Sequence, residues 1–160
     1  ELLADDEEYA AKAHEFSKRM KDVNEFLASI ELNPNMGTLD YVVTYQDSCH
    51  LLHGQKIKIA PRTLLKAIPG ITLREMRNAE VCCGSAGIYN LVQNEMAMDI
   101  LEHKMESVNA TKATVIATAN PGCMLQLQAG ARLHGQQQRV VHVVQLLDEA
   151  YQRAAASVVP

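Results

Sequence analysis

The sequence lacks a long apolar run, a block of basic residues and a dense cysteine pattern. No apolar stretch approaches the roughly 18 to 20 residues that a membrane-spanning helix needs. The first residues are acidic rather than basic and then apolar, so a signal peptide is not predicted. Lys and Arg total 15 against 19 Asp and Glu, and no basic run exceeds two residues. Nucleic acid is therefore not an expected partner.

Motifs of several enzyme classes are also missing. There is no Gly-x-Ser-x-Gly element of a serine hydrolase, and no glycine-rich stretch ending in Gly-Lys-Ser or Gly-Lys-Thr, as in a nucleotide-binding loop. Of the 160 residues, 48% are hydrophobic and 21% charged, which is typical of one globular domain. We therefore expect a single domain over residues 1–160. Because the sequence opens at Glu1 without an initiator Met, we expect it to be a piece of a longer protein.

Apolar periodicity predicts alternating strands and helices. Helical connections of this length are what neighbouring parallel strands require. The predicted fold is therefore α/β, with an open, mostly parallel four-stranded sheet flanked by helices. The predicted strands are residues 39–45, 71–73, 113–117 and 139–141, and the predicted helices between and after them are 61–68, 88–108, 124–133 and 143–155.

An extra helix is predicted ahead of the sheet, over residues 5–30. Its apolar residues recur at steps of three and four, which is typical of an amphipathic helix packed on a surface. Asn33-Pro34 and Gly37 are expected to end it. At the other end of the chain, residues 154–160 are expected to form a frayed tail. The apolar stripe consists of Tyr9, Ala13, Phe16, Met20, Val23, Leu27 and Ile30.

The four cysteines each fall in a loop that follows a predicted strand: Cys49 alone, Cys82 and Cys83 together, and Cys123 alone. A disulfide framework is not expected, because adjacent cysteines bridge only through a strained ring and a domain of this size does not depend on such staples. The carboxyl ends of parallel strands meet at one edge of a sheet, so the four thiols should lie at the same edge. A lone cysteine is often a small buried hydrophobe. Four at one edge favour a metal or redox site.

Two glycines support a ligand at this edge. Gly84 and Gly87 follow the cysteine pair and would let the backbone come close to a bulky group and aim N–H donors at sulfur. Helix amino termini also favour the thiolate form that a metal or a redox reaction needs.

The order Cys49, then Cys82-Cys83-Gly84, then Cys123 resembles the CCG cysteine-rich domain family. This family includes the cysteine-rich subunit of heterodisulfide reductase and the iron–sulfur subunits of glycolate- and lactate-oxidising enzymes. The resemblance covers about residues 9–152. It is stronger to the glycolate oxidase branch, through the segments Tyr45-Gln46-Asp47-Ser48-Cys49-His50, Cys82-Cys83-Gly84-Ser85-Ala86-Gly87-Ile88-Tyr89-Asn90 and Asn120-Pro121-Gly122-Cys123-Met124-Leu125-Gln126-Leu127.

The resemblance implies an electron-transfer module of a glycolate or other 2-hydroxy-acid oxidase complex. The four cysteines would hold an iron–sulfur cluster, with [4Fe–4S] the expected type. A flavin is expected only in a partner oxidase subunit, so this chain should not turn over substrate alone. The expected place is the cytoplasm, with attachment to the inner face of the membrane only through partners.

Two departures from the family pattern limit this resemblance. Asn120 stands where the heterodisulfide reductase branch has a fifth cysteine, so its large noncubane cluster is not expected. There is also no Cys-x-x-Cys-x-x-Cys run. The chain therefore resembles the C-terminal cysteine-rich domain of the larger subunit, and the N-terminal ferredoxin-like domain is an expected partner.

Two other functions are compatible with the same cysteines. The same thiolates could close a tetrahedral zinc site in a structural or docking domain, or Cys82 and Cys83 could be reactive thiols. Support for a bound group is expected from residues around the cysteines. These candidates are His50, His53, Gly84, Gly87, Asn120 and His142, with solvated loop positions as the alternative for His50 and His53, and a helix cap for His142.

Overall fold

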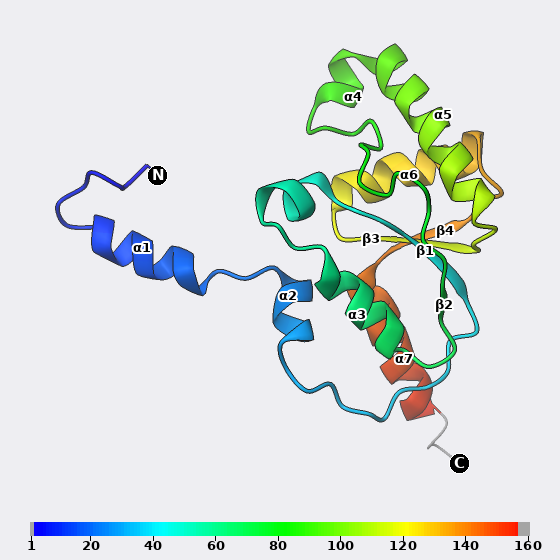
Figure 1. Ribbon diagram of the computed structural model, residues 1–160, viewed down its shortest axis with the longest axis horizontal. Coiled ribbons are helices and arrows are strands. Elements are labelled where there is room, and N and C mark those ends of the chain that lie inside the picture. The colour runs from blue at the N-terminus through cyan, green and yellow to red at the C-terminus, as the bar shows by residue number, and fades with distance from the viewer. Residues whose placement is uncertain (1, 157–160) are drawn as a thin grey trace.

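The computed structural model describes residues 2–156 as a parallel sheet with helices on both faces, preceded by an N-terminal arm (Figure 1). The sheet has four strands in the order β2-β1-β3-β4, and every neighbouring pair is parallel. The predicted α/β fold with an open parallel sheet is confirmed. The strands are β1 (Val42–Gln46), β2 (Thr72–Leu73), β3 (Val115–Thr118) and β4 (Arg139–His142).

The helices divide between the two faces of the sheet (Figure 1). Helices α3 (Ile59–Ala67) and α7 (Val143–Ala156) cover one face, and α5 (Asn94–Ala110) and α6 (Pro121–Leu133) cover the other. Successive side chains of a strand point to opposite faces. In β3, Val115 and Ala117 accordingly join the core under α3 and α7, while Ile116 joins the core under α5 and α6.

The prediction of one long surface-packed helix over residues 5–30 is wrong. The structure has two helices instead, α1 (Ala10–Arg19) and α2 (Val23–Ala28). The chain is extended at Met20, and Asp22 begins α2 by accepting a hydrogen bond from the Asn24 N–H at 2.8 Å. Helix α1 has no buried residue and lies away from the sheet, while Leu27 and Ala28 of α2 pack against the α3 and α7 core (Figure 1).

The helix expected over residues 88–108 is also interrupted. Gln93 has φ −130° and ψ 55°, which is not helical, so the segment forms a short α4 (Tyr89–Val92) and then α5. Helix α3 begins at Ile59 rather than at Pro61, which still lies in the first turn, where its missing N–H costs no helical bond. The frayed tail expected over residues 154–160 is wrong for residues 154–156, which are part of α7, where Ala154 is buried. Residues 157–160 lie outside the described residues.

Within residues 2–156, no helix combines the length and the apolar character that crossing a membrane requires.

Candidate metal centre

The cysteines follow the carboxyl ends of three neighbouring strands. Cys49 follows β1, Cys82 and Cys83 follow β2, and Cys123 follows β3. The chain crosses from β1 to β2 on one side of the sheet and later places β3 on the other side of β1. Open α/β sheets bind their ligands at the carboxyl ends of the strands, where the strand order reverses in this way. The loops that carry the cysteines therefore lie at the carboxyl-end edge of the sheet, as the sequence predicts.

The first loop carries the most exposed thiol. Cys49 directly precedes a π-helical turn, η1 (His50–Gly54), a rare conformation that is frequent at functional sites. Ser48, beside it, lies 3.2 Å from the Thr118 hydroxyl and accepts a hydrogen bond from the Ala119 N–H at 3.3 Å. Ser48 thereby ties the loop after β1 to the loop after β3.

The second loop is held from two sides before it reaches the cysteine pair. The Asp47 N–H donates to the Ala79 carbonyl at 3.1 Å, and the Gln46 side chain donates to the Val81 carbonyl at 3.0 Å. From α5, the Lys104 ammonium donates to the Asn78 carbonyl at 2.6 Å. These bonds fix the path of the backbone into Cys82 and Cys83.

The third loop is a helix start. Asn120 caps α6, because its Oδ1 accepts the Cys123 N–H at 3.1 Å. Its Nδ2 lies 3.2 Å from Nδ1 of His50, which links α6 to the turn after Cys49. Pro121 occupies the first turn, where it suits a helix start. Asn120 therefore has a structural role, because it joins the start of α6 to the turn after Cys49.

The four thiols interact in two pairs, and all four cysteines are free. Cys83 and Cys123, both buried, share a hydrogen bond that lowers the pKa of Cys83 to about 7 and raises that of Cys123 far above its usual range. Burial raises the pKa of Cys49, and the neighbouring Cys82, with which it hydrogen-bonds, raises it further. Electrostatic repulsion from Cys49 and Cys82 also raises the pKa of Cys123.

The other predicted residues occupy different positions around the thiols. The Gly84 N–H donates to Sγ of Cys82 at 3.3 Å, as predicted for this glycine, while the space beside Gly87 is open. His53 is exposed in η1. Nδ1 of His142 accepts the Val144 N–H at 3.2 Å, and its ring also bonds to the Ala119 backbone, so it caps α7 and contacts the loop before Asn120. Burial lowers the pKa of His142.

Two buried polar side chains near the thiols were missed from the sequence. Lys104 is 3% exposed, and its pKa is lowered by burial, although nearby Cys83 opposes that shift. Gln126 is 6% exposed and lies one helical turn after Cys123. Lys104 lies three residues after Leu101, and Gln126 lies three residues after Cys123, so each shares a helix face with a buried residue. This spacing can be read from the sequence and could have indicated that both side chains are buried.

The donor set suits an iron–sulfur cluster. It combines four thiols with the Gly84 N–H aimed at sulfur and with the Gln126 amide, whose buried Nε2 has no partner among the described residues. Gly84 is packed so closely that a Cβ there would collide with the Ala97 carbonyl oxygen and lie 3.2 Å from Nε2 of Gln126. Within residues 2–156, however, no three or more His, Cys, Asp or Glu side chains stand so that they could hold a metal ion.

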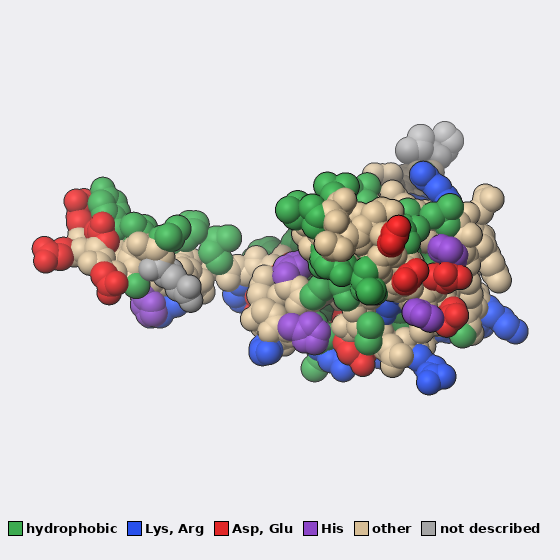
Figure 2. All heavy atoms as spheres, turned by 90° about the horizontal axis from the view of Figure 1, so that it is seen from above, with side chains coloured by type: hydrophobic (Ala, Val, Ile, Leu, Met, Phe, Trp, Pro, Cys, Tyr) green, Lys and Arg blue, Asp and Glu red, His purple; other side chains and the backbone are tan. Residues whose placement is uncertain are grey.

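An apolar surface, the α4 face, lies beside the cysteine pair. It comprises the exposed side chains of Ile88, Leu91, Val92 and Met96, which are between 52% and 78% accessible. Figure 2 looks onto the end of the molecule where α4 lies and shows hydrophobic side chains gathered there. An apolar group of this kind beside a functional loop is typical of a protein contact surface.

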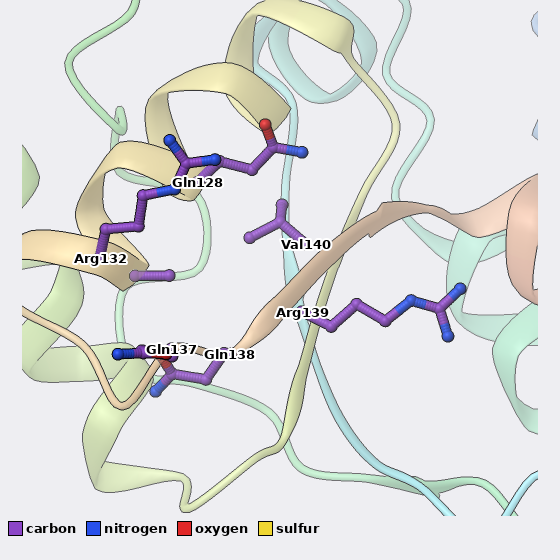
Figure 3. A pocket seen from close by; sticks show the side chains of 7 residues that line it. Gln128, Arg132, Gln137, Gln138, Arg139 and Val140 are labelled. Atoms are coloured by element: carbon purple, nitrogen blue, oxygen red, sulfur yellow. The ribbon is translucent and has the colours of Figure 1, made fainter.

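A pocket at the opposite edge of the sheet is not part of this centre. It lies between α6 and the start of β4, with Gln128, Arg132 and Gln138 among its lining residues. In Figure 3 the Arg139 side chain points away from Gln128 and Arg132, and it pairs with Glu149 at 2.7 Å.

Comparisons with known proteins identify several relatives of this chain. The chain is 46% identical over 153 residues to the probable glycolate oxidase iron-sulfur subunit of Bacillus subtilis, covering 93% of this chain and 34% of that protein. It is 34% identical over 131 residues to a subunit of the fumarate reductase (CoM/CoB) of Methanothermobacter marburgensis, covering 81% of this chain and 27% of the relative. Lactate utilization protein A of Bacillus cytotoxicus is 27% identical over 148 residues, which are 92% of this chain and 62% of the relative.

The chain thus spans 34%, 27% and 62% of the length of these three relatives. The sequence model of the CCG cysteine-rich domain family matches residues 43–128. That segment is more than half of the chain and contains all four cysteines and the β1, β2 and β3 loops that carry them. This chain therefore belongs to the CCG cysteine-rich domain family.

Proposed function

We propose that this chain is an electron-transfer domain of an iron–sulfur subunit in a complex that oxidises glycolate or a related 2-hydroxy acid. Cys49, Cys82, Cys83 and Cys123 are the proposed ligands of a [4Fe–4S] cluster. Oxidation of the substrate belongs, in this proposal, to a flavin-containing partner subunit. A ferredoxin-like domain of the same subunit and that flavin subunit are the proposed electron-exchange partners, and the proposed location is cytoplasmic.

The meeting of three cysteine-bearing loops at one strand edge carries this proposal. Loops far apart in the sequence bring together thiols that interact in pairs, with a backbone N–H already donating to one sulfur. The relative named as an iron-sulfur subunit supports the cofactor. A bound cluster of this type would supply one-electron transfer.

The residues around the thiols have separate tasks in this proposal. Gly84 lets the cysteine loop pack closely against Ala97 of α5, and its N–H stabilises negative charge on sulfur. Asn120 fixes the start of α6 and thereby the position of Cys123. Because no three potential ligands within residues 2–156 stand ready for a metal ion, the loops of Cys49 and Cys82, which carry the less buried thiols, adjust when the cluster binds.

The α4 face is the proposed contact with the flavin subunit. Electron transfer weakens steeply with distance, so the partner's redox centre has to approach the edge that carries Cys49 and Cys82. The α4 face lies next to that edge and offers the apolar surface that forms the centre of a protein interface. Leu91→Glu should therefore weaken co-purification while leaving the cluster absorption intact.

The direct test is the metal content of the anaerobically purified protein. Visible absorption, electron paramagnetic resonance, and iron, sulfide and zinc analysis would be measured after reconstitution. Four irons and four sulfides per chain are expected for one [4Fe–4S] cluster. Stoichiometric zinc without iron would replace this proposal with the structural zinc site, and a metal-free protein that cycles between dithiol and disulfide would replace it with thiol redox chemistry.

Cys82→Ser in the complete complex separates electron transfer from assembly. Serine is a poor replacement for a thiolate ligand, so the cluster should be lost or altered while the partners still co-purify. The measurement is dye reduction by the reconstituted flavin and iron–sulfur subunits, alongside co-purification. Ala110→Ser, an equally small change at the exposed end of α5, is the control. Unchanged dye reduction in Cys82→Ser would reject the redox role.

A further inference from the structure

Gln126 is a buried hydrogen-bond donor without an acceptor. Its side chain is 6% exposed, and Nε2 has no partner among the described residues. It lies on α6 one turn after Cys123, on the face that packs toward α5. Buried amide N–H groups are rarely left unpaired in native proteins, so this one indicates an acceptor that the protein chain alone does not supply.

The orientation of the Gln126 amide is fixed by Asn90. Nδ2 of Asn90 donates to Oε1 of Gln126 at 3.1 Å, which leaves the two N–H groups of Nε2 free. Asn90 is itself anchored, because its backbone N–H donates to the Ser85 carbonyl at 3.4 Å. The amide is therefore held by α4, which is bonded to the loop that carries the cysteine pair.

The free end of the amide lies against the cysteine loop. A Cβ built on Gly84 would lie 3.2 Å from Nε2 of Gln126, so the glycine leaves the space that the amide needs. Gly84 directly follows Cys83, and its own N–H donates to Sγ of Cys82. The Gln126 N–H groups and the Gly84 N–H thus lie close together beside the proposed ligands.

We propose that Gln126 donates a hydrogen bond to a sulfur atom of the bound cluster and that Asn90 positions it to do so; this inference rests on the proposed function. A donor of this kind stabilises the more negatively charged, reduced form of the cluster and so raises its reduction potential. Gln126 is in this sense a tuning residue, since it changes the potential without being a ligand.

The test compares Gln126→Met with Gln128→Met in the reconstituted protein. Met has a similar volume to Gln but no N–H, and Gln128 lies on the same helix at the distant pocket (Figure 3). We expect the midpoint potential of Gln126→Met to shift to more negative values, and iron release to a chelator to be roughly tenfold faster. Gln128→Met should match the parent protein in both measurements.

Asn90→Leu provides a second variant should Gln126→Met not fold, because it leaves α6 unaltered and only releases the amide from its partner. It should shift the potential in the same direction by a smaller amount. A cluster that forms in all variants at one common potential would overturn the role of Gln126 while leaving the proposed function intact. Failure of the parent protein to form any cluster would overturn both.

Discussion

Arg62 binds Asp47 through two parallel hydrogen bonds, from Nη1 to Oδ1 and from Nη2 to Oδ2, each 2.8 Å long. Asp47 is 3% exposed and lies two residues before Cys49. The same guanidinium also bonds to Glu75, ahead of the cysteine pair, at 2.8 and 3.0 Å. One arginine of α3 therefore joins the loops that follow β1 and β2, and these acceptors raise its pKa, against the effect of burial.

Arg62→Met is expected to lower the free energy of unfolding by about 3 kcal/mol, because it leaves the buried Asp47 carboxylate without its partner. Chemical denaturation followed by circular dichroism measures this value. Lys66→Met removes an exposed cation from the same helix and should change stability by less than about 0.5 kcal/mol. Equal effects of the two substitutions would contradict a structural role for the Arg62 and Asp47 pair.

Gly84→Ala and Gly87→Ala should differ in their cost. Both glycines have a positive φ, +93° and +66°, so alanine is strained by roughly 1 to 2 kcal/mol at either position. Only at Gly84 would the new Cβ also collide with the Ala97 carbonyl, whereas the space beside Gly87 is open. Gly84→Ala should therefore be less stable than Gly87→Ala by about a further 1 kcal/mol, measured by thermal and chemical unfolding.

Glu149 should make the stability of the fold depend on pH. Burial raises the pKa of its carboxyl, but hydrogen bonds from Tyr41 and Arg139 outweigh that effect, so the pKa lies below its usual value of 4.5. A lowered folded-state pKa contributes stability that is present above the unfolded value and is lost as the pH falls through the folded value.

Glu149→Gln should consequently be less stable than the parent protein at neutral pH, and the difference should shrink once the pH falls below about 4.5. Unfolding free energies measured across that range provide the test. Glu95→Gln, which changes an exposed carboxyl on α5, serves as the control and should show no such convergence. A constant difference between Glu149→Gln and the parent at all pH values would show that the pKa of Glu149 is not lowered in the folded protein.

Removal of the metal should loosen the cysteine loops but keep the sheet. The core under α3 and α7 contains no cysteine and includes Tyr45, Leu65 and Leu146, so it remains packed without a bound group. After chelation we expect the far-UV helical signal to persist, while hydrogen exchange becomes faster in residues 49–54 and 82–88. Complete loss of the helical signal would instead indicate that the metal is required for folding, as in a zinc-stabilised domain.

The sequence by itself predicted the sheet and the edge at which the cysteines gather. Apolar runs such as Val115-Ile116-Ala117 mark strands because a strand buried on both faces has to be hydrophobic throughout. Parallel strands in turn place the following loops at one edge, so the convergence of the loops that carry Cys49, Cys82, Cys83 and Cys123 followed from their order along the chain. These inferences depend on local pattern and on chain direction, which the sequence contains.

Tertiary structure alone decided where helices break and which polar side chains serve the site. The apolar stripe of residues 5–30 has helical periodicity, but only α2 finds a surface to pack on, and the capping bond of Asp22 starts a new helix. The partners of Arg62 and of Gln126 come from other loops or helices, so no local pattern indicates them. Periodicity reports which face of an element is apolar, whereas the acceptor or donor that a buried polar group meets depends on the packing of distant segments.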